Sequence, residues 1–463
     1  MADHADLAIL TERIGRLRLR DDPALVTTEA AGLRQSLVDL LIASEARTNE
    51  LLAEGRAAEL ADTVQLTVAA NGALADLATV LERRAGEWDG DRRIDALTEA
   101  VAARRALVER APDTSVAGLA ASLDDLAVAL GAAGRDDESL AAAGEAVTRH
   151  RRLAEADPDH RPVLARALRA LSLRLRAAGH LDDALDEITE AVELFRGLTP
   201  ADPGLLGRLA ASVGNRSATL RDLGRLDEAV TDGRTAVELY RGLADGDPTL
   251  RPHLADALHN LALACTDAGL AEAALAAVDE SVAVRRTLAA DASATVHDEL
   301  ARSLRLLAAR HHDLGHTDDA LAAVSEAADE YEWLGAAGED DVSGAAAERA
   351  YCLMTAAMLA AEAGRDEQAV ASFAGAIDAF RDLARDQIDP YLRDAVTALF
   401  GLSRHHLGAG RDEAAFETIA DAVNLVADNP EAAARVLSDT MAAAILAAHD
   451  EIAAATGRPT RPG

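Results

Sequence analysis

The histidines are the residues whose spacing first suggests chemistry. They form two adjacent pairs, His311/His312 and His405/His406. His312 also lies four residues before His316, a spacing that can place two zinc ligands on one helical face. Gly315 stands between them at a predicted helix end, so one face does not hold both, and no third ligand is evident. We therefore expect solvated or groove-lining histidines, with no metal and no other cofactor.

Other reactive residue types also lack the pattern of a catalytic centre. The sequence has no Gly-rich phosphate loop, no Gly-x-Ser-x-Gly elbow and no Cys-x-x-Cys. Paired carboxylates such as Asp182/Asp183 begin predicted helices, where the positive helix end favours them without any catalytic role. Cys265 and Cys352 lie in Ala/Leu-rich patterns typical of buried, reduced thiols. These observations predict that the protein is not an enzyme.

Composition limits the partners. The chain of 463 residues carries 80 acidic and 46 basic residues, a formal net charge of −34, and none of the bases is lysine. Such acidity argues against binding to the nucleic-acid backbone, which requires cationic contacts. No apolar run approaches the length of a transmembrane helix, and no signal peptide is evident at the N-terminus. We expect a cytoplasmic protein without a nucleic-acid or membrane partner.

The elements that must position any binding residues repeat along the chain. Hydrophobic residues make up 49% of the sequence and aromatics only 2%, and the dominant Ala and Leu favour helices. A Glu-Ala-Val motif or a variant recurs at intervals of 45–49 residues. Its central small residue is Ala100, Ala146, Ala191, Ala236, Ser281, Ala327, Ala376 or Ala422. A fixed period of this length predicts stacked repeats.

Each repeat contains two helical patterns. In one repeat an apolar stripe at intervals of four, three and four residues predicts a helix over 163–178, followed by Gly179 and a second helix over 181–198. The glycine tolerates the positive φ that ends a helix. Equivalent glycines occur in the other repeats, at Gly134, Gly224, Gly269, Gly315, Gly364 and Gly410. One hairpin cannot bury both of its stripes, so it must stack on its neighbours.

Columns of small residues accompany these glycines. Seven residues before each turn glycine stands Ala127, Ser172, Ser217, Ala262, Ala308, Ala357 or Ser403. Five residues after the last six glycines stands Ala184, Ala229, Ala274, Ala320, Ala369 or Ala415. Small residues at these positions allow two helix backbones to approach closely.

This pattern resembles the tetratricopeptide repeat (TPR), in a long form of about 45 residues similar to the repeats of kinesin light chain and of bacterial signalling proteins. The resemblance implies an all-α, right-handed α-solenoid of about eight helix-turn-helix repeats with helical caps. We divide the chain into an N-terminal helical cap at 1–62, a repeat array at 63–430, and a C-terminal capping helix with a disordered tail at 431–463.

The resemblance also implies a concave face lined by the first helix of each repeat. Six columns, counted back from the turn glycine, should point into it. The candidate peptide-binding residues in these columns are Arg166, Arg169, Arg176, Asn215, Arg221, His259, Asn260, Arg302 and Arg305. By analogy with TPR clamps, Asn215 and Asn260 would bond a peptide backbone, and Arg302 or Arg305 would meet a carboxylate. Alternatively, both asparagines only bridge adjacent helices.

The leading hypothesis is a non-enzymatic scaffold that binds a protein or peptide partner along the concave face. A second hypothesis is a peptide-sensing regulator whose superhelix changes pitch and switches a separate effector. A third is a purely architectural module that self-associates into a homo-oligomer.

Overall fold

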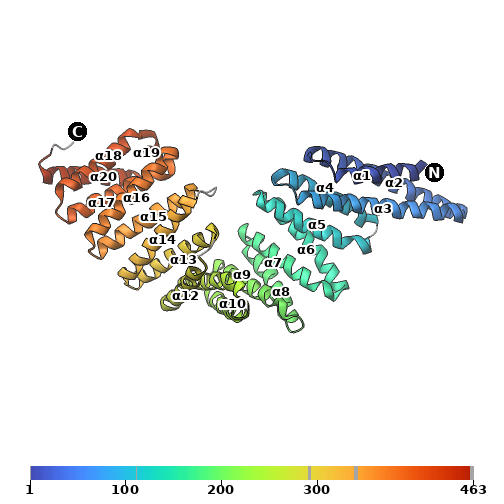
Figure 1. The fold of residues 1–463 in the computed structure, drawn as a ribbon, viewed down its shortest axis with the longest axis horizontal. Coiled ribbons are helices and arrows are strands. Elements are labelled where there is room, and N and C mark those ends of the chain that lie inside the picture. The colour runs from blue at the N-terminus through green and yellow to red at the C-terminus, as the bar shows by residue number, and fades with distance from the viewer. Residues whose placement is uncertain (1, 111, 290–292, 338–341, 459–463) are drawn as a thin grey trace. The chain divides into compact units, whose positions relative to one another are not determined.

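The computed structural model describes residues 2–110, 112–289, 293–337 and 342–458. Within these residues every regular element is an α-helix or a short 3-10 helix (Figure 1). The chain divides into two compact units, residues 1–225 and 226–463. The all-helical fold predicted from the sequence is confirmed.

The first unit contains nine α-helices within the described residues, and two 3-10 helices. Their bounds are α1 (Ala2–Leu17), α2 (Pro23–Glu54), α3 (Ala57–Ala85), α4 (Gly90–Arg110), α5 (Pro112–Ala132), α6 (Asp136–Ala156), η1 (Pro158–His160), α7 (Arg161–Ala177), α8 (Leu181–Leu198), η2 (Pro203–Leu205) and α9 (Leu206–Asp222). Consecutive helices pack as hairpins, and each hairpin packs against the next.

The second unit has the same plan over its described residues. Its helices are α10 (Leu226–Gly246), η3 (Pro248–Leu250), α11 (Arg251–Asp267), α12 (Ala271–Ala289), α13 (Ala294–Asp313), α14 (Thr317–Ala337), α15 (Val342–Glu362), α16 (Asp366–Asp386), α17 (Ile388–Gly408), α18 (Asp412–Asp428), α19 (Pro430–Val436) and α20 (Asp439–Thr456). We call α11, α13, α15 and α17, the first helices of four successive hairpins, the inner layer of this unit.

The seven turn glycines each end the first helix of their hairpin, as predicted. Gly179 has φ 79° and Gly315 has φ 76°, both in the left-handed region that favours glycine. The next amide then bonds back into the helix, as when His180 N–H donates to the Leu175 carbonyl at 2.9 Å. This geometry satisfies a carbonyl that the helix end would otherwise leave without a partner. It reverses the chain within a few residues, so the second helix packs directly on the first.

The small-residue columns lie where the helices approach most closely. The alanines five residues after the turn glycines are completely buried, and so are the central residues of most Glu-Ala-Val motifs. The column seven residues before the glycines is at most 2% exposed. Repetition in the sequence therefore follows the repetition of the core, because each hairpin needs the same small residues at its two interfaces.

Ion pairs join the second helices of successive hairpins. An arginine in one such helix meets a carboxylate 39 or 40 residues further along the chain. The pairs are Arg105–Glu145 at 2.6 Å, Arg151–Glu190 at 2.7 Å, Arg241–Glu280 at 2.9 Å, Arg286–Glu326 at 2.6 Å and Arg381–Asp421 at 3.2 Å. Each pair is solvated and contributes at most about 1 kcal/mol. Because the same spacing recurs from one pair of hairpins to the next, these ion pairs favour a single register between neighbouring hairpins.

The described residues near both ends of the chain form helices. The predicted boundary between residues 62 and 63 falls inside α3, while α20 packs on α18 through buried Ile445 and Ile452. The division into caps and array stays a prediction. Residues 459–463 of the predicted disordered tail lie outside the described residues.

Two helical segments of the described chain, Ala57–Ala85 and Ser115–Ala132, have the length and apolarity of a membrane span. Both belong to the core of the first unit. Leu74 and Leu77 of one and Leu119 and Leu123 of the other are completely buried there. A buried core helix meets the same criteria as a membrane span, so these segments need no membrane to explain their composition.

Candidate functional site

Polar side chains connect the helices of the inner layer in the second unit. His259 Nδ1 of α11 lies 3.0 Å from Ser303 Oγ of α13. Arg305 of α13 forms an ion pair with Glu348 of α15. The Tyr351 hydroxyl of α15 donates to Asp394 Oδ2 of α17 at 2.7 Å. One surface therefore presents connected polar groups from four successive hairpins.

Two cavities open on this surface. The first, of about 500 Å³, has His259, Thr355 and His312 beside the apolar side chains of Leu263 and Leu359. It receives residues from α11, α13, α14 and α15. A mixture of imidazole, hydroxyl and aliphatic groups is typical of sites that combine apolar contact with a few directional hydrogen bonds.

The second cavity, of about 790 Å³, lies further along the same layer and is lined from α13, α14, α15 and α17. Tyr391 and Glu348 belong to it alone. Arg302, Arg305 and Tyr351 line both cavities. These three residues therefore form the wall that the two cavities share, and a ligand that filled both would pass over them.

The charge of the shared wall is balanced internally. Arg302 pairs with Asp298 one helical turn earlier, and Arg305 pairs with Glu348. The hydrogen bond to Asp298 raises the pKa of Arg302. Burial opposes the charge of Arg305, but Tyr331 and Glu348 outweigh it and raise the pKa of that guanidinium. Both arginines stay charged, so the carboxylate of an acidic ligand could replace Asp298 or Glu348 as their partner.

Tyr351 is held at both ends. Its ring meets the ring of buried Phe380 edge-on at 5.2 Å between centroids, and its hydroxyl bonds Asp394. Burial and that hydrogen bond raise the pKa of Tyr351 to about 12, so the phenol is neutral at physiological pH. Burial likewise raises the pKa of neighbouring Cys352 to about 12, which keeps its thiol protonated and a poor nucleophile. This wall is suited to binding.

The candidates in the first unit lie on α7 and α9. Arg176 Nη1 reaches Asp222 Oδ2 at 3.0 Å, and Arg221 lies 3.3 Å from the other oxygen of that carboxylate. Arg166 is exposed, and Arg169 is half-buried. The structure thus brings Arg176 and Arg221 together around one aspartate.

The two asparagines fall in different units. Asn215 is half-buried on α9 of the first unit, and Asn260 is exposed on α11 of the second. Their predicted joint action on a peptide backbone stays a prediction. Of the other candidates in the second unit, His259, Arg302 and Arg305 share one cavity.

Sequence reasoning missed Tyr351 and Thr355, although the signal was present. The candidates predicted from the sequence come from the repeats of Gly179, Gly224, Gly269 and Gly315. Counting 13 and 9 residues back from Gly364 gives Tyr351 and Thr355, in two of the columns predicted to point inward. Tyr391 and Glu348 stand outside these columns, and only the packing of α15 and α17 places them at the site.

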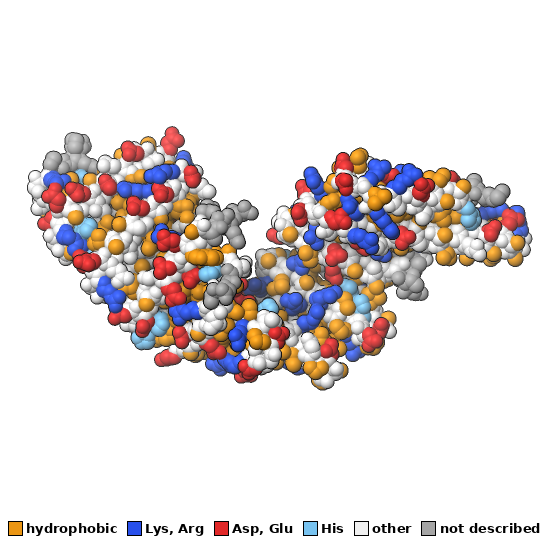
Figure 2. Space-filling view, in the orientation of Figure 1, with side chains coloured by type: hydrophobic (Ala, Val, Ile, Leu, Met, Phe, Trp, Pro, Cys, Tyr) orange, Lys and Arg blue, Asp and Glu red, His pale blue; other side chains and the backbone are white. Residues whose placement is uncertain are grey.

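Charged side chains of both signs are interspersed with apolar ones over the visible surface (Figure 2). No large area of one sign is apparent on that face. Charge of either sign is therefore distributed locally over that face.

Comparison with known proteins finds similarity to repeat proteins. Residues 119–161 and 209–245 match the family model described as tetratricopeptide repeat, and no curated protein matches the chain. Among solved structures, BtubC (BKLC) from P. vanneervenii is 18% identical, with 54% of this chain and 92% of that chain covered and a TM-score of 0.40. A putative kinesin light chain from Podosopora anserina with TPR-like repeats is 17% identical, with 49% and 100% covered and a TM-score of 0.38.

Aspartyl phosphate phosphatase F from Bacillus subtilis is 14% identical to the chain, with 90% of this chain and 92% of that chain covered and a TM-score of 0.42. The first matched segment, 119–161, consists of most of α5, all of α6 and the 3-10 turn after it, which is one helical hairpin with its connection. The two matched segments are thus similar to tetratricopeptide repeats, and the described residues have the stacked helical-hairpin fold expected from the sequence.

Proposed function

We propose that this chain is a non-enzymatic scaffold that binds a peptide or an extended protein segment on the inner layer of its second unit. The observation that carries the proposal is the shared wall, where Arg302, Arg305 and Tyr351 border two adjoining cavities. A segment that filled both would lay an acidic side chain or a C-terminal carboxylate against the arginines. Leu263 and Leu359 would take its apolar side chains.

The affinity would come from exchange of partners. Each arginine exchanges a solvated internal carboxylate, worth at most about 1 kcal/mol, for one supplied by the ligand. A hydrogen bond to a charged group contributes about 1.5–3 kcal/mol, and the difference adds to the affinity. A preformed helical surface pays little ordering cost on binding. We extend the proposal to a cytoplasmic location, where the acidic exterior would keep the array soluble.

A displayed library of random 12-residue peptides tests this proposal. We expect the peptides selected by the purified chain to be enriched in Asp and Glu. A selected peptide, labelled and followed by fluorescence anisotropy, should bind the double variant Arg302→Gln/Arg305→Gln at least about tenfold more weakly, because 1.4 kcal/mol corresponds to tenfold.

Arg381→Gln is the matched control. Arg381 is also an arginine in a solvated ion pair between neighbouring hairpins, but it lies on α16 outside the inner layer. Its replacement should leave the affinity unchanged. A library without enriched peptides, or equal affinities of the double variant and the wild type, would contradict the proposal.

The regulatory and architectural alternatives are separable from the scaffold. A peptide sensor should change its radius of gyration in small-angle scattering when the selected peptide binds, whereas a plain scaffold should not. An architectural module should form oligomers that dissociate on Leu446→Glu, since Leu446 is 39% exposed on the terminal helix α20. Deleting residues 431–463 is a poorer test, because it would uncover the core beneath Ile445 and Ile452.

A further inference from the structure

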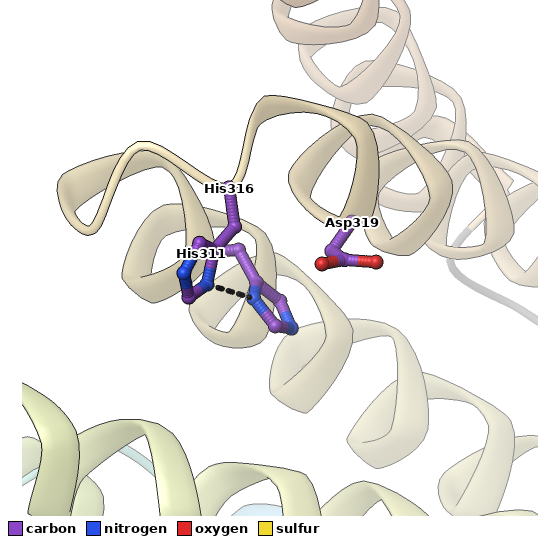
Figure 3. A group of neighbouring side chains, drawn as sticks. All are labelled: His311, His316 and Asp319. Carbon is purple, nitrogen blue, oxygen red and sulfur yellow. Dashed lines mark hydrogen bonds between the residues drawn. The ribbon is translucent and has the colours of Figure 1, made fainter.

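Three side chains of metal-ligating types meet at the turn between α13 and α14. They are His311 in the last turn of α13, His316 directly after the turn glycine, and Asp319 in the first turn of α14 (Figure 3). One ligand atom from each lies within 4.8 Å of the other two. None of the three lines the two cavities of the inner layer.

The backbone of the turn fixes this arrangement. Gly315 takes φ 76°, and the His316 N–H then donates to the His311 carbonyl at 2.8 Å. The first turn of α14 is in turn anchored by the Ala320 N–H, which donates to the His316 carbonyl at 3.0 Å. The sequence rules out a pair of His312 and His316 on one helical face, because Gly315 ends the helix between them. Reversal of the chain at Gly315 selects His311 instead.

The distance between the imidazoles suits a metal better than a hydrogen bond. His311 Nδ1 and His316 Nδ1 are 3.4 Å apart, near the limit for a hydrogen bond between two nitrogens. Two nitrogens bound to zinc at about 2.0–2.1 Å under a tetrahedral angle are about 3.3–3.4 Å apart. The imidazoles thus stand at the separation of two zinc ligands, and exposed Asp319 can adjust its rotamer to close the third position.

The charges around the cluster leave the third ligand available. Arg365 pairs with Asp318 at 2.6 Å, and Arg310 pairs with Asp313 at 2.9 Å. These two nearby arginines are thus neutralised by carboxylates other than Asp319. The net charge of −34 also favours cations at the surface of the protein.

We propose that His311, His316 and Asp319 bind one Zn²⁺ ion through the two Nδ1 atoms and one carboxylate oxygen, with water in the fourth position. Two imidazoles and a carboxylate form a donor set for a borderline divalent ion, whereas Mg²⁺ and Ca²⁺ prefer oxygen ligands alone. The bound ion joins the end of α13 to the start of α14.

Calorimetric titration of the untagged full-length chain with ZnCl₂ tests the site. We expect one equivalent to bind in a saturable manner, and His316→Ala to weaken that binding at least about tenfold, since even partners of metal ligands contribute 10–100-fold to affinity. Asp319→Asn should weaken it as well. Co²⁺ in place of zinc should give the intense visible absorption of a tetrahedral site, which His316→Ala abolishes.

His312→Ala is the matched control, because His312 is adjacent in sequence to His311 and four residues from His316. It should leave the zinc affinity within a factor of two. All the replaced side chains are solvated, and an unchanged far-UV circular dichroism spectrum verifies that the variants are folded.

Absence of saturable zinc binding would overturn the proposal, and so would equal affinities of His316→Ala and the wild type, or an equal loss in His312→Ala. Peptide binding by the inner layer is independent of the result, since His316→Ala should retain full affinity for the selected peptide.

Discussion

Gly401→Ala should destabilise the second unit, although a glycine-to-alanine change inside a helix is normally favourable. Gly401 lies in the interior of α17, where alanine gains about 0.8–1.0 kcal/mol in helix propensity. A Cβ at this position would lie 2.8 Å from Cε1 and 3.2 Å from Cζ of Phe373 on α16. Because the first distance is shorter than real Cβ contacts, the ring or the helix must move.

The ring of Phe373 has little room to move. The side chain is 4% exposed, and its ring lies 6.3 Å from that of His405, measured between centroids. Overpacking a well-packed core costs about 1–3 kcal/mol. Subtracting the propensity gain leaves a net destabilisation between about zero and 2 kcal/mol. A change of 1 kcal/mol shifts the melting temperature of a domain of this size by about 2–4 °C.

Gly242→Ala is the matched control. Gly242 is exposed in the interior of α10 in the same unit, and a Cβ there would meet nothing within 4 Å. This variant should be more stable than the wild type by about 0.5–1 kcal/mol, because only the helix propensity changes. The free energies of unfolding of the two variants should therefore differ by about 1–3 kcal/mol. At the centre of this range Gly401→Ala destabilises the unit and Gly242→Ala stabilises it.

Tryptophan fluorescence gives an assay confined to the second unit. The chain has two tryptophans, of which Trp88 lies in the first unit and Trp333 in the second. In a Trp88→Phe background, Trp333 alone reports denaturant unfolding of its own unit. This separation matters because a repeat array does not necessarily unfold in one step.

A double-mutant cycle completes the test. Phe373→Leu removes the ring, so adding Gly401→Ala to it should cost less than adding it to the wild type, with a coupling energy of about 0.5–3 kcal/mol. If Gly401→Ala were as stable as Gly242→Ala, or if the coupling energy were zero, the close contact between α16 and α17 would not limit the packing of the unit.

Two further predictions concern a turn and pH. Gly269→Ala should destabilise the second unit by about 1–2 kcal/mol in the same fluorescence assay, because φ is +72° although a Cβ would meet nothing within 4 Å; an unchanged midpoint would contradict this. Burial, followed by the charge of His150, lowers the pKa of His160. Below the ordinary histidine pKa of about 6.5, the unfolded state binds a proton at His160 more readily than the folded state does. The free energy of unfolding therefore falls on acidification. The denaturation midpoint of the first unit, followed by Trp88, should fall between pH 7.5 and 5.5, and by less in His160→Asn; equal falls would refute the assignment.

The sequence by itself determined the repeat architecture. The 45-residue period, the turn glycines and the small-residue columns predicted helical hairpins, and the bounds of α8, Leu181–Leu198, are those expected from its apolar stripe. These features are readable because each satisfies a local or nearest-neighbour requirement. A helix end needs positive φ, and a close helix–helix contact needs a small side chain. Neither requirement depends on distant parts of the chain.

Tertiary structure alone decided which side chains meet. Counting columns predicted that Arg302 and Arg305 face inward, but their pairing with Asp298 and Glu348 depends on rotamers and on the spacing between hairpins. The chain reversal at Gly315 brings His316 to His311, a pair that no helical spacing in the sequence indicates. Periodicity in a sequence records which face of a helix a residue occupies. The contacts across a turn or between hairpins depend on three-dimensional packing, which that periodicity does not encode.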